Sequence, residues 1–136
     1  MTIREIKKYF FAYRNGVVAD ALRRSGMPHT MIFGVDLPAI SALADQIGHD
    51  YELAEELWND NDVRESRILA AYVFPPEDID LKRAQQLCDS VRTQEEANIL
   101  VFRLLRRFPY IHELYCSLDA EKQAFAHIAL SRVLES

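Results

Sequence analysis

Three arginines stand close together near the end of one apolar stretch. Arg103, Arg106 and Arg107 would lie within about 100° of one another on a helical wheel, opposite the apolar residues of the same stretch. Guanidinium groups bind phosphate oxygens through paired hydrogen bonds, so such a face could hold a nucleic-acid backbone. The same residues could instead complement the dipole at the end of a helix and stay in solvent. Both interpretations remain open.

A second basic stripe is predicted near the amino end. Lys7 and Arg14, flanked by Arg4 and Lys8, would lie along one side of a first helix. If this stripe and the three arginines face the same way, phosphate binding is favoured over a solvated surface.

One short pattern has the spacing of a metal site. His112 and Cys116 are four residues apart, as in the helical zinc motif, but two ligands do not complete a site. His127 or Cys88 would have to supply the third ligand. The sequence also has no glycine-rich loop that could cradle a nucleotide phosphate. We therefore expect no metal and no cofactor.

The charge is distributed unevenly along the 136 residues. The net charge is −5, with six basic and two acidic residues in 1–30, two and twelve in 31–80, and eight and seven in 81–136. A net negative charge argues against nucleic-acid contact over the whole surface. The length and the 49% hydrophobic content predict one globular domain over 1–136.

The apolar stretches are short and interrupted by charge. None is long enough to span a bilayer, and the first does not read as a secretion signal. Cys88 and Cys116 are far apart in the chain, which favours reduced thiols. We expect a cytoplasmic protein with no membrane partner.

The elements that must position these side chains are predicted to be helices. Apolar residues recur at three- and four-residue spacing, and no period-two alternation predicts a strand. The expected fold class is all-α, a HEAT-like helical repeat of seven or eight helices. Asp62 with Glu65 three residues later has the spacing of a capping box at a helix start. The predicted helices run from after Thr2 to before Gly26, from Asp36 to about Ile47, from Asp50 to the 59–62 cluster, from Asp62 to Phe74, over about Leu81–Ser90 and Thr93–Phe108, near Tyr110–Cys116, and from about Asp119 to Leu134.

An internal match supports a repeat. The stretch 54–58 matches 84–88 at an offset of thirty, and 65–69 matches 96–100 at thirty-one. Each copy would be a helix pair that cannot bury its apolar stripe alone, as in stacked repeats. Chance similarity between amphipathic helices is the competing explanation. The identical pairs are Ala54/Ala84, Leu57/Leu87, Glu65/Glu96, Ile68/Ile99 and Leu69/Leu100.

The stretch 31–74 contains a series of short motifs: Phe33-Gly34-Val35, Asp36-Leu37-Pro38, Leu43-Ala44, Leu57-Trp58 and Glu65-x-Arg67-x-Leu69-Ala70, with a continuation at Leu87-Cys88-Asp89. This series resembles the DNA-alkylation-repair family of HEAT-like helical-repeat proteins, whose characterised members are glycosylases that remove positively charged alkylated purines. The resemblance implies a curved all-α solenoid with a concave surface that faces DNA.

The resemblance also suggests site residues. The family uses a carboxylate to stabilise positive charge that develops on the sugar and lesion, and Asp89 stands at that place. The family's tryptophan four residues earlier is Gln85 here; Tyr72 or Tyr110 could supply an aromatic ring instead. An arginine that holds a backbone phosphate would be one of the three described above.

Two functions follow as the leading hypotheses, ahead of a remote third, a metal-dependent enzyme at His112 and Cys116. The first is a DNA-binding protein that contacts duplex DNA through Arg103, Arg106, Arg107, Lys7 and Arg14, with or without excision at Asp89, so whether it is an enzyme stays open. The alternative is a non-catalytic HEAT-like scaffold that binds a protein partner or a second copy of itself.

Overall fold

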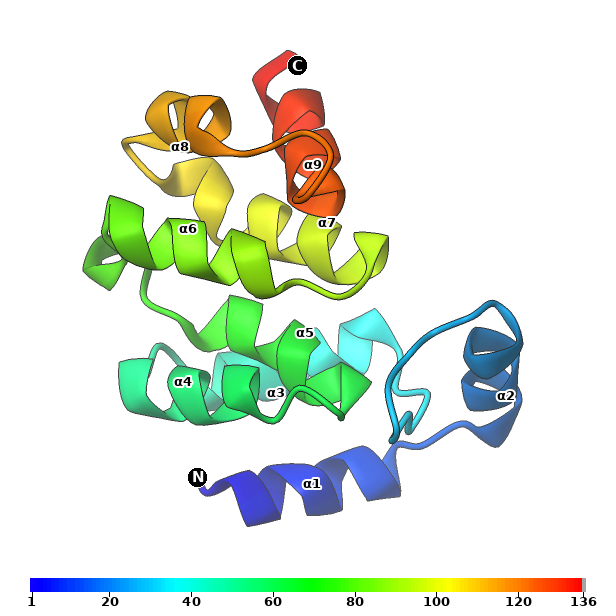
Figure 1. Ribbon diagram of the computed structural model, residues 1–136. Helices are drawn as coiled ribbons and strands as arrows, with labels where there is room; N and C mark the ends of the chain where they lie inside the picture. Colours follow the sequence, from blue (N-terminus) through cyan, green and yellow to red (C-terminus); the bar gives the residue numbers. More distant parts are fainter. Residues whose placement is uncertain (136) are drawn as a thin grey trace. The chain divides into compact units, whose positions relative to one another are not determined.

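The computed structural model describes residues 1–135, and within them the regular structure is helical. These residues form nine α-helices and two short 3-10 helices, with no strand beyond an isolated bridge. The all-α prediction is confirmed, whereas the predicted number of helices was slightly low. The chain divides between Phe74 and Pro75 into two compact units. We describe each unit by itself (Figure 1).

Unit 1 covers the first 74 residues. Helix α5 packs against both α3 and α4, and α1 packs on α4. The helices are α1 (Ile3–Ala12), α2 (Gly16–Arg24), α3 (Leu37–Ile47), α4 (Tyr51–Asn59) and α5 (Arg64–Val73).

The prediction of a single long first helix is wrong, because the helix is interrupted before Asn15 and a second helix begins after it. The Asn15 side chain accepts hydrogen bonds from the backbone N–H groups of Val17 and Val18 and so begins a new helix, α2. Its own N–H donates to the Phe33 carbonyl at 2.9 Å. Val17, in the first turn of α2, is 78% exposed as a result.

Other predicted helix starts in unit 1 are confirmed. Thr2, Asp36 and Asp50 each cap a helix by accepting a backbone N–H with the side chain. Gly48, with a φ of +75°, follows α3 where a stop was expected. These caps fix where the apolar faces of α1, α3 and α4 begin.

Glu65 does not form the predicted capping box with Asp62. Val63 precedes the first turn of α5, and no side chain caps it. The Glu65 carboxylate is fully buried and accepts the backbone N–H groups of Phe33, Gly34 and Val35 at 3.0–3.3 Å. Arg64 also donates to it at 2.7 Å. This carboxylate therefore anchors the loop before α3 to the start of α5.

Gly34 lies where a side chain could not fit. Its φ is +78°, and a Cβ there would stand 2.3 Å from the Asn15 carbonyl oxygen. The close approach brings the loop against the first turn of α2. Gly34 and Glu65 together therefore fix the position of this loop relative to the starts of α2 and α5.

Unit 2 runs from Pro75 onward. Helices two apart in sequence pack side by side, α6 on α8 and α7 on α9, as expected for stacked helical repeats. The elements are η1 (Pro76–Asp78), α6 (Leu81–Ser90), α7 (Gln94–Arg103), η2 (Leu105–Arg107), α8 (Ile111–Ser117) and α9 (Ala124–Glu135).

The two copies of the internal match are both helix pairs. The first lies in α4 and α5 and the second in α6 and α7. Three of the four equivalent apolar pairs are fully buried, namely Ala54 and Ala84, Leu57 and Leu87, and Leu69 and Leu100, whereas Ile68 is buried and Ile99 is half-buried. The repeat-like interpretation is therefore supported within each unit.

Two predicted boundaries in unit 2 were wrong. The helix predicted over Thr93–Phe108 ends at Arg103 and continues as the 3-10 turn η2. The last helix begins at Ala124 rather than near Asp119. The Asp119 side chain accepts the N–H groups of Glu121 and Lys122, which holds a turn there and lowers the pKa of Asp119.

Candidate nucleic-acid interface

The three arginines end α7 and form η2. Arg103, Arg106 and Arg107 are exposed, while Leu104 and Leu105 between them are buried. The predicted division into a charged outer side and an apolar inner side is thus confirmed, although the α-helix does not continue. Because the helix changes to a 3-10 turn after Arg103, the three arginine side chains do not share the same neighbours.

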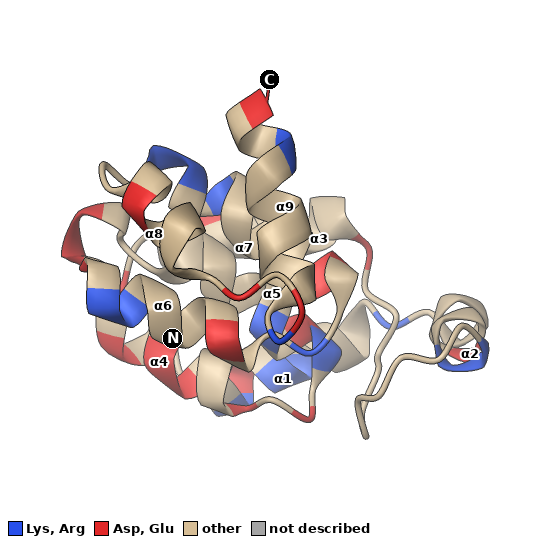
Figure 2. Cartoon of the chain, turned by 45° about the horizontal axis from the view of Figure 1, so that its top comes forward, with Lys and Arg blue, Asp and Glu red and all other residues tan. Residues whose placement is uncertain are grey.

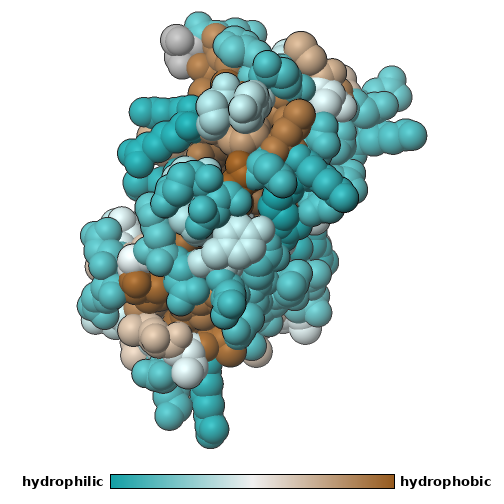
Figure 3. All heavy atoms as spheres, turned by 90° about the vertical axis from the view of Figure 1, so that its left-hand side faces the viewer, coloured by the Kyte–Doolittle hydropathy of each residue, from teal (hydrophilic) through white to brown (hydrophobic). Residues whose placement is uncertain are grey.

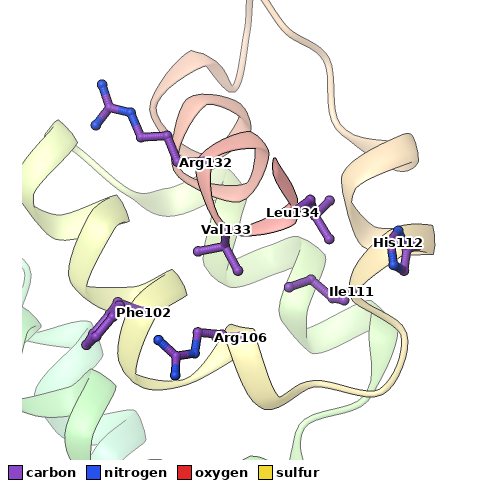
Figure 4. A pocket seen from close by; sticks show the side chains of 7 residues that line it. All are labelled: Phe102, Arg106, Ile111, His112, Arg132, Val133 and Leu134. Carbon is purple, nitrogen blue, oxygen red and sulfur yellow. The ribbon is translucent and has the colours of Figure 1, made fainter. Parts of the chain in front are cut away.

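Arg106 lies at a hollow on the surface of unit 2. The hollow has a volume of 510 Å³ and lies among η2, α8 and α9 (Figure 4). Phe102 and Arg106 stand together on one side, with apolar side chains of α8 and α9 beside them and Arg132 extending outward from α9. No carboxylate is found among the lining residues: Phe102, Arg106, Ile111, His112, Arg132, Val133 and Leu134.

Two of these residues were missed by the sequence analysis. Phe102 is 55% exposed, and the Cζ atoms of Arg106 and Arg103 lie 4.8 and 5.7 Å from its ring centroid. The signal was present, since Phe102 and Arg106 are four residues apart on the charged side. Arg132 gave no local signal because only the packing of α9 on α7 brings it near.

Arg107 faces a different environment. It lines a second hollow, of 700 Å³, together with Tyr110 and three carboxylates, Glu77, Asp78 and Asp80. Negative charge beside Arg107 competes with a phosphate for the guanidinium. The structure therefore groups Arg103 and Arg106 around Phe102 and sets Arg107 apart.

The predicted stripe of Lys7 and Arg14 on one helix was wrong, because α1 ends before Arg14. Lys7 forms an ion pair with Asp60, Nζ to Oδ2 3.3 Å. Arg14 donates to the Phe11 carbonyl at 2.7 Å and lies over the Phe11 ring. Within unit 1, Lys and Arg residues lie on α1 and α2, and Asp and Glu residues lie on α4 (Figure 2).

Asp89 is exposed at the last turn of α6. Its Oδ1 accepts a hydrogen bond from the Gln123 side chain at 3.2 Å. Gln85, one turn earlier, is half-buried. Tyr110 is 54% exposed and packs edge-on against Phe108 in the turn after η2.

Asp89 and the arginines lie at opposite ends of unit 2. Gln94 at the start of α7 donates to the Phe125 carbonyl near the start of α9, and Asp89 bonds to Gln123 at that same end. Arg103 is the last residue of α7 and Arg106 follows it, at the far end of a helix that is roughly 15 Å long at 1.5 Å per residue. The candidate carboxylate and the candidate phosphate ligands do not converge.

A family comparison bears on what this surface does. A family model described as DNA alkylation repair enzyme matches residues 6–127, nearly the whole chain. The chain belongs to the DNA alkylation repair enzyme family. No curated protein and no solved structure matches it significantly.

The residues that carried the resemblance to the DNA alkylation repair family serve the fold. Glu65 binds the backbone of Phe33-Gly34-Val35, and Arg67 lies over the ring of the buried Trp58, Cζ to centroid 4.0 Å. These motifs therefore stabilise the fold. They leave the exposed residues, such as the arginines and Asp89, as the candidates for a functional role.

The predicted histidine and cysteine pair lies on α8. Among residues 1–135, no group of three or more histidine, cysteine or acidic side chains is placed to hold a metal ion. His127, a suggested third ligand, stacks on Tyr115 with ring centroids 4.7 Å apart. In the same part of the chain, no helix has the length and apolar character needed to cross a membrane.

The two cysteines are free thiols in different surroundings. Cys116 is exposed, whereas burial, helped by the charge of Asp89, raises the pKa of Cys88 to about 12.

We expect a thiol reagent at pH 8 to modify Cys116 rapidly and Cys88 only after unfolding. Rapid modification of both thiols in the folded protein would contradict this. Because the pKa of Cys88 is raised above its ordinary value near 9, its contribution to stability is complete below pH 9 and is lost as pH rises toward 12.

Proposed function

We propose that this protein binds duplex DNA through the phosphate backbone, as a HEAT-like member of its repair family. Arg103 and Arg106 are the principal contacts, and Arg132 is a further one. The single observation that carries the proposal is the exposed pair of guanidiniums around Phe102, beside a hollow whose lining within residues 1–135 includes no carboxylate. Membership of a DNA repair family supplies the ligand class.

The basic residues of unit 1 take a secondary part in this proposal. Lys7 pairs with Asp60 in a half-buried position and would have to leave that ion pair to bind a phosphate. Arg14 would have to leave the Phe11 carbonyl to bind DNA. Arg107 would have to overcome the carboxylates beside it.

Equilibrium binding to a fluorescent duplex tests the proposal. Two duplexes of equal length are compared, one intact and one containing an abasic-site mimic. We expect both to bind at low salt, because backbone contacts do not depend on sequence. Tighter binding to the mimic would place the protein at damaged sites, and failure to bind either duplex would refute the proposal.

Excision is a second candidate, favoured by the exposed carboxylate of Asp89, whose orientation Gln123 holds. If the protein releases an alkylated purine, Asp89→Asn is expected to slow release by at least about 100-fold, because electrostatic stabilisation of the transition state is lost. Duplex affinity should change by less than about twofold. Glu113→Gln, which also neutralises an exposed carboxylate of unit 2, is the matched control. Equal release by wild type and Asp89→Asn would exclude Asp89.

A protein-binding scaffold is the alternative. Unit 1 exposes several large apolar side chains: Phe11, Tyr13, Val17, Val18 and Met31. The face seen in Figure 3, by contrast, is mostly hydrophilic with hydrophobic side chains in separate patches. A protein partner or a second copy would therefore be sought at α1 and α2, where exposed apolar residues gather.

A further inference from the structure

Phe102 is one of the exposed large hydrophobic residues of unit 2. It is 55% exposed, although its neighbours Leu100, Val101 and Leu104 are buried. Burying a phenylalanine contributes roughly 1.5–3 kcal/mol to folding, so this ring adds little to the core. A single exposed ring is ordinary by itself. Its surroundings are what distinguish Phe102.

Two positive charges are gathered at this ring. The guanidiniums of Arg106 and Arg103 lie 4.8 and 5.7 Å from the ring centroid, and each gains from the negative face of the ring. They are therefore within about one Debye length of each other, which is ~10 Å at 0.1 M salt. An anion close to the ring would be attracted by both positive charges.

The hollow beside Phe102 has the size and lining of a ligand site. Its 510 Å³ lies within the roughly 300–1,000 Å³ typical of small-molecule pockets. Ile111, Val133 and Leu134 contribute apolar surface, and Figure 4 shows Arg106 reaching toward Phe102. An aromatic face, arginines and an apolar floor fit a nucleotide, whose base stacks and whose phosphate binds arginine.

If the protein binds duplex DNA, only some nucleotides of that DNA can reach the hollow beside Phe102. A base inside a duplex already stacks on its neighbours and has no free face, whereas an unpaired base does. We propose that Phe102 and Arg106 form a site for an unpaired nucleotide of DNA, with the base on the Phe102 ring and the phosphate on Arg106. This inference rests on the proposed binding to duplex DNA and adds a preference for interrupted duplexes.

The test compares a fully paired duplex with one that carries a single unpaired 2-aminopurine, whose fluorescence falls on stacking. We expect wild type to bind the interrupted duplex about tenfold more tightly, since stacking on an aromatic side chain contributes on this scale, and to quench the probe. Phe102→Leu should abolish the preference and the quenching, because leucine offers no ring on which the base can stack. Phe102→Tyr should restore both.

Phe125→Leu is the matched control, because Phe125 is a 41% exposed phenylalanine of unit 2 that does not line the hollow. It should behave as wild type. Equal affinity for the two duplexes, or quenching that survives Phe102→Leu, would overturn the inference and leave the proposed function standing. Failure to bind either duplex would overturn both. Binding of free deoxyadenosine monophosphate as tight as that of the interrupted duplex would assign the site to a free nucleotide and overturn it as a DNA site.

Discussion

Replacing Glu65 with alanine is expected to lower the free energy of unfolding by about 3–5 kcal/mol, because it removes one partner of a buried ion pair. The carboxylate accepts three backbone N–H groups of the loop before α3 and one hydrogen bond from Arg64. Its removal leaves these donors away from water without their acceptor. Domains of this size are stable by only about 5–15 kcal/mol, so the effect is large. Urea unfolding followed by circular dichroism measures it.

Two variants make this expectation specific. Glu65→Gln keeps the shape and one acceptor oxygen, and should lose less stability than Glu65→Ala. Glu5→Ala removes a carboxylate that also accepts a backbone N–H, from Thr2, but at an exposed helix start, and should lose far less. A loss below about 1 kcal/mol for Glu65→Ala would contradict the structural role assigned to Glu65.

The largest expected effect on binding comes from Arg103→Gln combined with Arg106→Gln. At roughly 1 kcal/mol for each exposed charge-assisted contact, the double variant should bind duplex DNA about 30-fold more weakly. The slope of log affinity against log salt should also fall by roughly two, since each phosphate contact contributes about 0.9. Fluorescence anisotropy over a salt series measures both quantities.

The matched control for this variant is Arg107→Gln combined with Lys122→Gln. It removes the same charge from unit 2, but Arg107 lies beside Glu77, Asp78 and Asp80, and Lys122 lies in the turn before α9. We expect less than a threefold loss of affinity. If both double variants lose the same affinity, the effect is one of net charge and the particular grouping around Phe102 is wrong.

The local signals in the sequence predicted most helix starts. Asp36, Asp50 and Thr93 begin helices where a short polar side chain can accept a backbone N–H, and this depends only on neighbouring residues. The break at Asn15 was missed because the apolar spacing of residues 3–17 continues across it. What decides that position is a contact with Phe33, distant in sequence.

The candidate site was predicted only in part. Exposure of the three arginines followed from the apolar residues between them, which must be buried. The division between Arg106 and Arg107 did not follow, because it depends on which segments pack nearby. Arg106 lies near α9, whereas Arg107 lies near the acidic turn after Pro75. Glu65 was read as a local cap, although its partners are some thirty residues away.

The measurement that tests the central claim most directly is the affinity of the wild-type protein for a fluorescent duplex at 50 and 200 mM salt. Binding through a few phosphate contacts predicts that affinity is clear at the lower concentration and falls by about tenfold or more at the higher one. Absence of binding at the lower concentration, or an affinity that does not change with salt, would contradict the account.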